Sequence, residues 1–282
     1  MRKQVGFTLV ELVIVMVLTG IIAGVLATQL GPTIQSYLAV ERRAALLDQA
    51  DTSLRRIATE IRSAVPNSLR LHSSQCLELA PTIDGGRLRT GPDITKPASP
   101  GAFLDQFETK ATFDVLTPFT NPVGKGDLVV IGNQNTTDLY DGTNVAFIDS
   151  VQKTGDTTGE HRITLTEVRT IPQGYDSGRF VVVPAGWRSV RYACVNPGKD
   201  EHDNGSGTLY RVTSNVLDLG AGCPAPANTA PIVATNVEAC SFEYSPNQGA
   251  TQESGFAQLR LTLRARGESV SLTLGAHVDN VP

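Results

Sequence analysis

The feature that most constrains this chain is a continuous apolar run close to its N-terminus. Residues 7–30 contain one charged side chain, Glu11, and the next charge along the chain is Glu41. A helix of roughly 20 apolar residues crosses the hydrocarbon core of a bilayer, so this run is long enough to span a membrane. An isolated carboxylate inside such a segment is costly, which indicates that Glu11 has a function and a buried partner.

Two interpretations of this run each leave something unexplained. A membrane anchor accounts for its length and for Arg2 and Lys3, which favour a cytoplasmic N-terminus, but it gives Glu11 no role. A secretory signal peptide accounts for the small residue Ala27, where signal peptidase could cut. Its apolar region would be too long, however, and it would open with an acid.

The stretch Gly6-Phe7-Thr8-Leu9-Val10-Glu11 resembles the processing site of type IV pilins and pseudopilins. In these families a short basic leader ends in Gly, and the mature chain begins with Phe and has Glu as its fifth residue. The resemblance implies that a prepilin peptidase cuts between Gly6 and Phe7 and that the new amine of Phe7 is methylated. It also implies that Glu11 pairs with the N-terminal amine of a neighbouring subunit in a filament. Loss of one partner of such a buried pair typically costs about 3–5 kcal/mol.

Other segments resemble the O-type minor pilin of the mannose-sensitive haemagglutinin (MSHA) pilus system. They lie after the helix, ahead of the final hairpin and at the C-terminus, in residues 64–70, 239–244, 266–272 and 277–282. This resemblance implies a minor pilin that primes or caps a filament. Two alternatives stay open: a pseudopilin of a type II secretion system, and a surface-exposed adhesive tip or binding domain.

The apolar run is expected to continue as an amphipathic half-helix over residues 31–65. Its apolar face recurs at steps of three and four, in Leu47, Ala50, Leu54, Ile57, Ile61 and Val65. Pro66 then supplies a stop, since it disfavours helical geometry in the residue before it. We expect a break at Gly31 and Pro32, because proline lacks an N–H and clashes with the preceding turn. In pilins a Gly or Pro near this place marks a bend or unwinding of the helix in the filament.

Beyond residue 66 the apolar pattern alternates with a period of two, which predicts an antiparallel β-rich head over residues 66–282. The expected strands are residues 76–79, 111–115, 127–131, 162–166, 179–183, 190–195 and 207–212, followed by a hairpin of residues 259–264 and 270–274. Residues 81–122 are rich in Gly, Pro, Thr and Asp and are expected to form a long loop or a subdomain insertion. The predicted fold class is α+β, with a long N-terminal helix packed on this head.

The four cysteines, Cys76, Cys194, Cys223 and Cys240, form an even set in a head that is expected outside the cytoplasm, which predicts disulfides. Three connectivities are open. We favour Cys194 with Cys223, because they are close in sequence and bracket a turn-rich segment. No cysteine or histidine cluster has the spacing of a zinc site, so no metal is predicted.

The sequence offers little chemistry beyond assembly. Residues 199–205 superficially resemble a calcium loop, but His202 replaces an oxygen ligand and Arg211 stands where a bidentate Glu belongs. There is no phosphate-binding glycine loop and no nucleophile elbow. The formal net charge of −4 does not favour nucleic acid as a partner. We therefore expect no enzyme and no cofactor.

The resemblance to pilins also implies where the chain is located. Before assembly the chain lies in the bacterial inner membrane with its head in the periplasm, and afterwards it lies in a pilus or at its tip. The expected partners are the inner membrane, the prepilin peptidase, other major and minor pilins and the pilus assembly platform.

Overall fold

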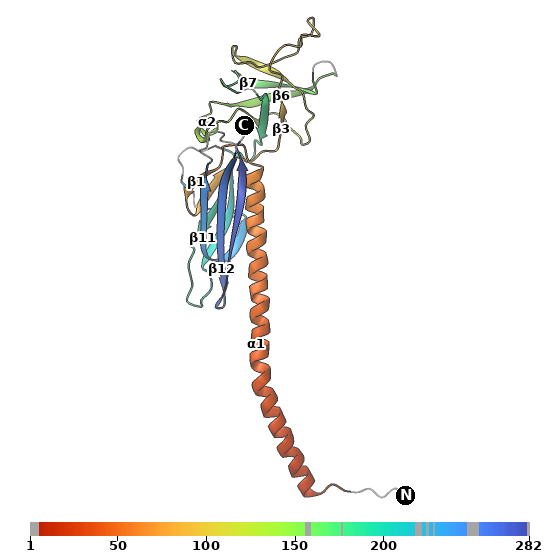
Figure 1. The fold of residues 1–282 in the computed structure, drawn as a ribbon, viewed down its shortest axis with the longest axis vertical. Helices are drawn as coiled ribbons and strands as arrows, with labels where there is room; N and C mark the ends of the chain where they lie inside the picture. The colour runs from red at the N-terminus through yellow and green to blue at the C-terminus, as the bar shows by residue number, and fades with distance from the viewer. Residues whose placement is uncertain are drawn as a thin grey trace, which may run out of the picture.

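A long helix, α1 (Leu9–Arg62), projects from a head of antiparallel strands (Figure 1). The computed structural model describes residues 6–155, 159–175, 177–217, 222–223, 226–227, 229–246 and 254–280. The predicted α+β class, with the helix packed on a β-rich head, is confirmed. Most of the expected leader, residues 1–5, and the last two residues of the chain lie outside the described residues.

The helix α1 runs without interruption through Gly31 and Pro32. Proline leaves the carbonyl four residues earlier without its N–H partner. Hydroxyl groups bond to other carbonyls of this turn: Thr33 Oγ1 donates to the carbonyl of Gln29 over 2.9 Å, and Ser36 Oγ donates to that of Pro32 over 3.0 Å. The ribbon curves but stays helical (Figure 1). The expected break is therefore absent from the single chain, and its place in a filament stays a prediction.

The C-terminal half of α1 packs on the head through one face. The buried side chains of this face, each at most 5% exposed, are Leu46, Ala50, Ser53, Leu54, Ile57, Ala58 and Ile61. Their steps of three and four keep them on one side of the helix. The prediction for Leu47 is wrong: it is 47% exposed, because its neighbour Leu46 takes the place one turn before Ala50.

Seven strands form the sheet on which α1 lies. They are β1 (Arg70–Ser73), β2 (Cys76–Leu79), β9 (Ser189–Val195), β10 (Gly207–Ser214), β11 (Ile232–Ser245), β12 (Ser254–Ala265) and β13 (Glu268–Asp279). Their spatial order is β1-β2-β9-β10-β11-β12-β13, and each neighbouring pair is antiparallel. α1 packs against β11, β12 and β13. The predicted β12–β13 hairpin is confirmed, with Leu261 opposite Leu272.

The chain between β2 and β9 forms a second sheet of its own. Its strands are β3 (Asp84–Arg87), β4 (Lys110–Val115), β5 (Leu128–Ile131), β6 (Val145–Lys153), β7 (His161–Arg169) and β8 (Arg179–Val183), with a short helix α2 (Thr136–Tyr140) after β5. The order is β3-β8-β5-β6-β7-β4. The two outer strands also meet, since Leu88 bridges Val115 and the backbone N of Leu116 donates to the carbonyl of Arg87 over 2.8 Å. The sheet therefore closes into a small barrel.

Residues 81–122 belong to this inserted barrel and also contain a long loop, because residues 88–109 form no helix or strand apart from the single bridge at Leu88. They supply β3 and β4, of which the sequence predicted only β4. β3 has the sequence Asp-Gly-Gly-Arg, with no apolar residue to mark it as a strand. Its glycines permit close packing, because a Cβ on Gly85 would lie 2.7 Å from the carbonyl O of Phe180 and one on Gly86 would lie 2.2 Å from Thr117 Oγ1.

The barrel is joined to the rest of the head by a small core and an asparagine network. The core consists of Val65, Ala80, Leu128, Val130, Leu139, Tyr140 and Val183. Beside it, Asn67 Nδ2 donates to the carbonyls of Asn133 and Asn280 over 2.8 and 3.0 Å. Asn133 Nδ2 in turn donates to the carbonyl of Pro66 over 2.5 Å. These bonds tie the helix end, the barrel and the chain after β13 together.

Two disulfides cross the head, Cys76–Cys223 and Cys194–Cys240. The favoured pairing of Cys194 with Cys223 is therefore wrong. The sheet curls so that the turn between β1 and β2 lies beside β11, where the backbone N of Phe242 donates to the carbonyl of Ser74 over 2.7 Å. This curl brings Cys194 of β9 and Cys240 of β11 to a Cα–Cα distance of 6.6 Å. Closeness in sequence did not indicate closeness in the sheet.

Candidate functional site

The expected processing site lies just outside α1. Gly6 and Phe7 are exposed, and the side chain of Phe7 is 82% accessible. Thr8 is the N-cap in extended conformation, and its hydroxyl accepts a hydrogen bond from the backbone N of Glu11 over 3.3 Å. Such a cap satisfies one of the free N–H groups of the first turn. The bond between Gly6 and Phe7 thus lies in accessible chain directly before a capped helix.

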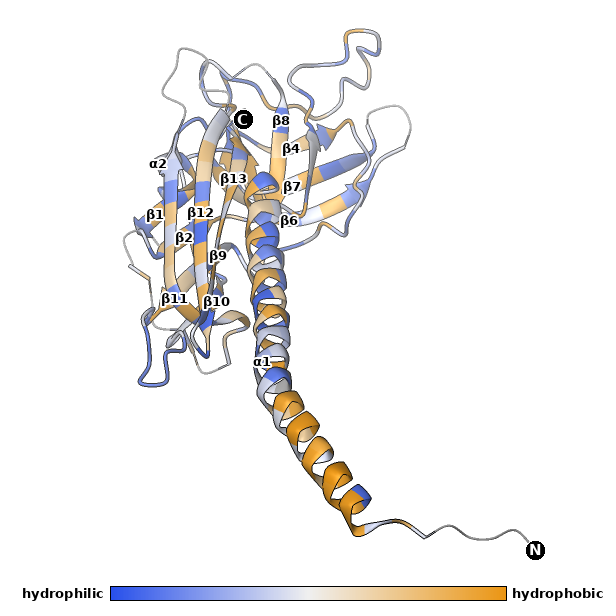
Figure 2. Cartoon of the chain, turned by 60° about the horizontal axis from the view of Figure 1, so that its bottom comes forward, coloured by the Kyte–Doolittle hydropathy of each residue, from blue (hydrophilic) through white to orange (hydrophobic). Residues whose placement is uncertain are grey.

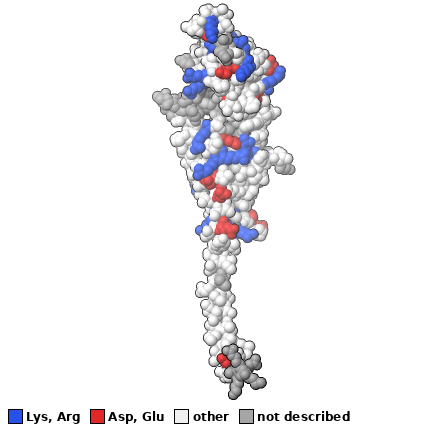
Figure 3. All heavy atoms as spheres, turned by 90° about the vertical axis from the view of Figure 1, so that its right-hand side faces the viewer, with Lys and Arg blue, Asp and Glu red and all other residues white. Residues whose placement is uncertain are grey.

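The carboxylate of Glu11 sits in the first turn of α1, where negative charge interacts favourably with the helix dipole. The side chain is exposed. Figure 3 shows an uncharged stalk with one acidic side chain near its end, while the other charged side chains gather on the head and the adjoining part of the helix. Glu11 is thus the only described charge on the projecting half of the helix.

The projecting half of α1 is apolar on every side (Figure 2). From Leu9 to Leu26, thirteen large apolar side chains are between 48 and 80% exposed. Among the described residues, α1 is the one helix long and apolar enough to cross a membrane. A helix that is apolar all round requires an apolar surrounding. Lipid or other apolar helices must therefore cover this half.

A comparison with protein families gives the same interpretation of this segment. The model for the prokaryotic N-terminal methylation motif matches residues 1–27. The chain is type IV pilin-like. Searches of curated proteins and of solved structures find no match to it.

The methylation motif indicates how the N-terminal segment is processed and where it resides. A type IV pilin-like prepilin is processed by a prepilin peptidase and assembles with other pilins. The apolar half of α1 is consistent with residence in the inner membrane followed by incorporation into a pilus. Pilins are in general structural proteins and not enzymes.

The head contains a buried carboxylate that the sequence pattern did not predict. Glu78 of β2 is fully buried and contacts Arg70 Nε at 2.6 Å, His72 Nε2 at 2.5 Å, Arg191 Nε at 3.1 Å and the hydroxyl of Ser189. Burial raises the pKa of the Glu78 carboxyl, but the hydrogen bonds from Ser189 and His72 and the two guanidinium groups lower that pKa by more, so it lies below its ordinary value. The cluster fixes β1, β2 and β9 to one another.

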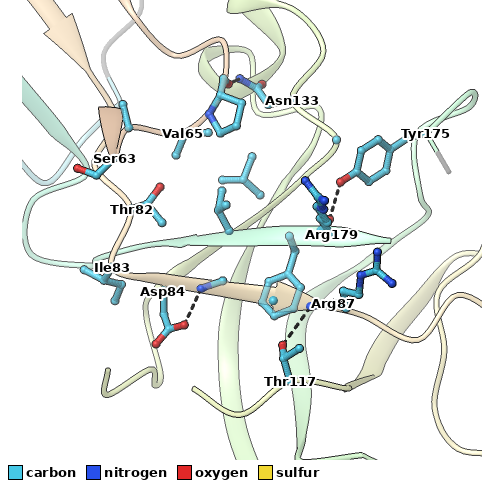
Figure 4. A pocket seen from close by; sticks show the side chains of 18 of the residues that line it. Ser63, Val65, Thr82, Ile83, Asp84, Arg87, Thr117, Asn133, Tyr175 and Arg179 are labelled. Carbon is cyan, nitrogen blue, oxygen red and sulfur yellow. Dashed lines mark hydrogen bonds between the residues drawn. The ribbon is translucent and has the colours of Figure 1, made fainter. Parts of the chain in front are cut away.

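A cavity of about 590 Å³ opens where the end of α1 meets the barrel (Figure 4). Its walls come from residues 62–66, from β3 and β8, and from the segment after β5. Its charged lining residues are Arg62, Asp84, Arg87 and Arg179. None of them stands out in the sequence, because they meet only after the barrel has closed.

The segment that superficially resembled a calcium loop has its oxygens engaged within the chain. The carboxylate of Asp200 accepts hydrogen bonds from the backbone N of His202 over 2.9 Å, and from the backbone N and Nδ2 of Asn204 over 2.8 and 3.1 Å. Among the described residues, no group of three or more His, Cys, Asp or Glu side chains could hold a metal ion.

Proposed function

We propose that this chain is a minor pilin of a type IV pilus of the MSHA kind, cut between Gly6 and Phe7 and methylated on Phe7. The observation that carries the proposal is the exposed apolar half of α1, which begins directly after the processing motif. Lipid covers this half before assembly, and like helices cover it in the filament. This apolar half of α1 is then the segment through which subunits join during polymerisation.

Glu11 sets the register of the filament in this proposal. Packing among apolar helices removes water, so the Glu11 carboxylate and the methylated amine of Phe7 both need a partner of opposite charge. The amine of one subunit supplies that partner for Glu11 of the next. An incorrectly placed subunit leaves both charges unpaired, which disfavours it.

The division of the chain follows from these roles. Residues 1–6 are the leader, residues 7–30 the polymerisation half and residues 31–65 the amphipathic half that holds the head, of which the helix itself ends at Arg62, three residues before the predicted end. Residues 66–282 are the extracytoplasmic head. Gly31 and Pro32 lie between the two halves, where the missing N–H of proline lowers the cost of bending or unwinding the helix in a filament.

The position of the barrel supports a place at the tip. It lies at the pole of the molecule opposite the N-terminus (Figure 1). A subunit stacked above this one along the direction of α1 would meet the barrel, whereas the last subunit of a filament has none above it. A protein that primes or caps the filament therefore accommodates the barrel without a steric conflict. The cavity beside the barrel also supports the adhesive alternative, in which the tip binds a surface ligand.

The processing step is tested by mass spectrometry of the mature N-terminus. We expect a chain that starts at methylated Phe7. A start at Thr28 would instead indicate signal peptidase and would overturn the proposal.

The assembly step is tested with Glu11→Ala and the matched control Glu41→Ala, which removes the next acidic side chain of the helix. We expect Glu11→Ala to leave leader removal intact and to reduce the number of filaments counted by electron microscopy, while Glu41→Ala leaves the number unchanged. Normal filament numbers in Glu11→Ala would count against an intersubunit role.

A further inference from the structure

The cavity between the end of α1 and the barrel carries positive charge that the protein itself does not neutralise. Three arginines line it: Arg62, Arg87 and Arg179. Within the described part of the chain, none of the three forms an ion pair with a carboxylate. The charge is therefore available to a ligand.

Two of these arginines are held side by side. Arg87 of β3 and Arg179 of β8 are direct cross-strand partners. Side chains in such positions have Cβ atoms about 4.5–5.5 Å apart, and like charges there destabilise a sheet. Figure 4 shows both at the same end of the cavity, beside Tyr175. The two guanidinium groups therefore repel each other when no ligand is bound, and a bound anion would offset that repulsion.

The acidic residue of the cavity cannot neutralise them. The carboxylate of Asp84 accepts hydrogen bonds from the backbone N of Gly85 over 2.8 Å, of Thr120 over 2.7 Å and of Asn121 over 2.6 Å. It stands at the other end of the short strand β3 and of the cavity (Figure 4). Its role is to hold the chain after β4, which leaves the arginine end positive.

The rest of the lining is largely apolar. Val181, Ile83 and Ala64 form part of the wall and are each partly exposed. The volume of about 590 Å³ lies within the range of about 300–1,000 Å³ that small-molecule sites have.

We propose that this cavity binds a small organic anion of the acidic-sugar class. Arg87 and Arg179 hold its carboxylate, and Val181, on the same face of β8 as Arg179, contacts the carbon face of its ring. A neutral sugar lacks the charge for the arginine end, and an inorganic anion lacks the carbon face for the wall. The inference goes beyond filament assembly and does not depend on processing at Gly6.

The test is calorimetric titration of the full chain, purified in detergent, with glucuronic acid and N-acetylneuraminic acid. Glucose, N-acetylmannosamine and inorganic phosphate are the matched probes. We expect the protein to bind at least one of the two acids, and to bind it more tightly than any of the three matched probes.

Arg87→Gln and Arg179→Gln should each weaken binding of the acid by roughly 10- to 100-fold, as loss of a hydrogen bond to a charged group predicts. Arg260→Gln is the control, because Arg260 is exposed on β12 and does not line the cavity. The thermal midpoints of Arg87→Gln and Arg179→Gln should equal or exceed that of the wild type, since each relieves the cross-strand repulsion. If Arg87→Gln or Arg179→Gln loses binding while its thermal midpoint is unchanged or higher, the variant is still folded.

Three results would overturn the inference. One is that neither acid binds at millimolar concentration. Another is that Arg260→Gln weakens binding as much as Arg87→Gln and Arg179→Gln do. The last is that phosphate or a neutral sugar binds as tightly as the acids. Any of these leaves the filament proposal standing, because that proposal is tested at Phe7 and Glu11.

Discussion

Replacing Glu78 with glutamine should be among the most damaging isosteric changes in the head. The carboxylate is fully buried, and the side chains of its partners Arg70 and Arg191 are only 15 and 5% exposed. Glutamine keeps the shape but removes the charge that compensates two guanidinium groups. Removal of one partner of a buried pair costs about 3–5 kcal/mol. Native domains have about 5–15 kcal/mol of stability in total, so this is a large fraction.

The pH dependence of this effect has a defined sign. The pKa of Glu78 in the folded protein is lower than its ordinary value of 4.5. The ionised carboxylate therefore stabilises the fold above the pKa of the unfolded chain, and this contribution is lost as the pH falls through the folded-state pKa. The wild type should lose it below about pH 4.5, whereas Glu78→Gln has none to lose. The free energies of unfolding of the wild type and of Glu78→Gln should therefore converge as the pH falls.

The assay is urea unfolding of the full chain in detergent, followed by the fluorescence of Trp187. This is the only tryptophan of the chain, and it lies two residues before Ser189, whose hydroxyl bonds to Glu78. The matched control is Glu243→Gln, which removes an exposed carboxylate from β11. Two results would refute this prediction. One is a free energy of unfolding for Glu78→Gln within about 1 kcal/mol of the wild-type value at pH 7. The other is a difference between the two proteins that stays constant as the pH falls below about 4.5.

Two further changes test the disulfides and one close backbone approach. Peptide mapping without reduction should link Cys76 to Cys223 and Cys194 to Cys240, and a peptide joining Cys194 to Cys223 would contradict the sheet order. Replacing Cys194 and Cys240 together by serine opens a loop with a sequence separation of 46, which should lower the free energy of unfolding by about 4 kcal/mol if chain entropy dominates. Gly205→Ala should lower the thermal midpoint through a loss of about 1–3 kcal/mol, because its Cβ would lie 2.0 Å from the carbonyl O of Asn236. Gly91→Ala, whose Cβ would meet no atom within 4 Å, is the control, and equal midpoints for the two variants would contradict the argument.

Local patterns predicted the elements whose burial depends on near neighbours. The helix face around Leu54 and Ile57 repeats at steps of three and four, and both side chains are fully buried. In the last hairpin, Leu259, Leu261 and Leu263 alternate with polar residues and are at most 1% exposed. The processing motif is local too, because residues 6–11 carry it without help from the rest of the chain.

Features that depend on distant pairing were not predictable in this way. In the sequence, Glu78 occupies the polar position of an alternating strand and looks solvent-facing. All four residues of β2 are buried, however, because β1 and β9 flank the strand and Arg191 faces Glu78. The connectivity of the cysteines and the arginine pair of the cavity likewise follow from which strands are neighbours. A period of two indicates that a strand exists but not which strand lies beside it.

The topology separates the helix α1 and its sheet from the barrel and its cavity. The chain leaves the seven-stranded sheet after Leu79 and returns at Ser189, and Leu79 lies directly opposite Val190. The barrel is therefore inserted between two strands that pair with each other, so the sheet under α1 is continuous without it. Changes in the barrel can alter the cavity while the helix face, its sheet and Glu11 keep their geometry. Residues 62–66 are the exception, because they end the helix and also line the cavity. The barrel and its cavity can therefore vary in sequence while the exposed apolar half of α1 stays the same.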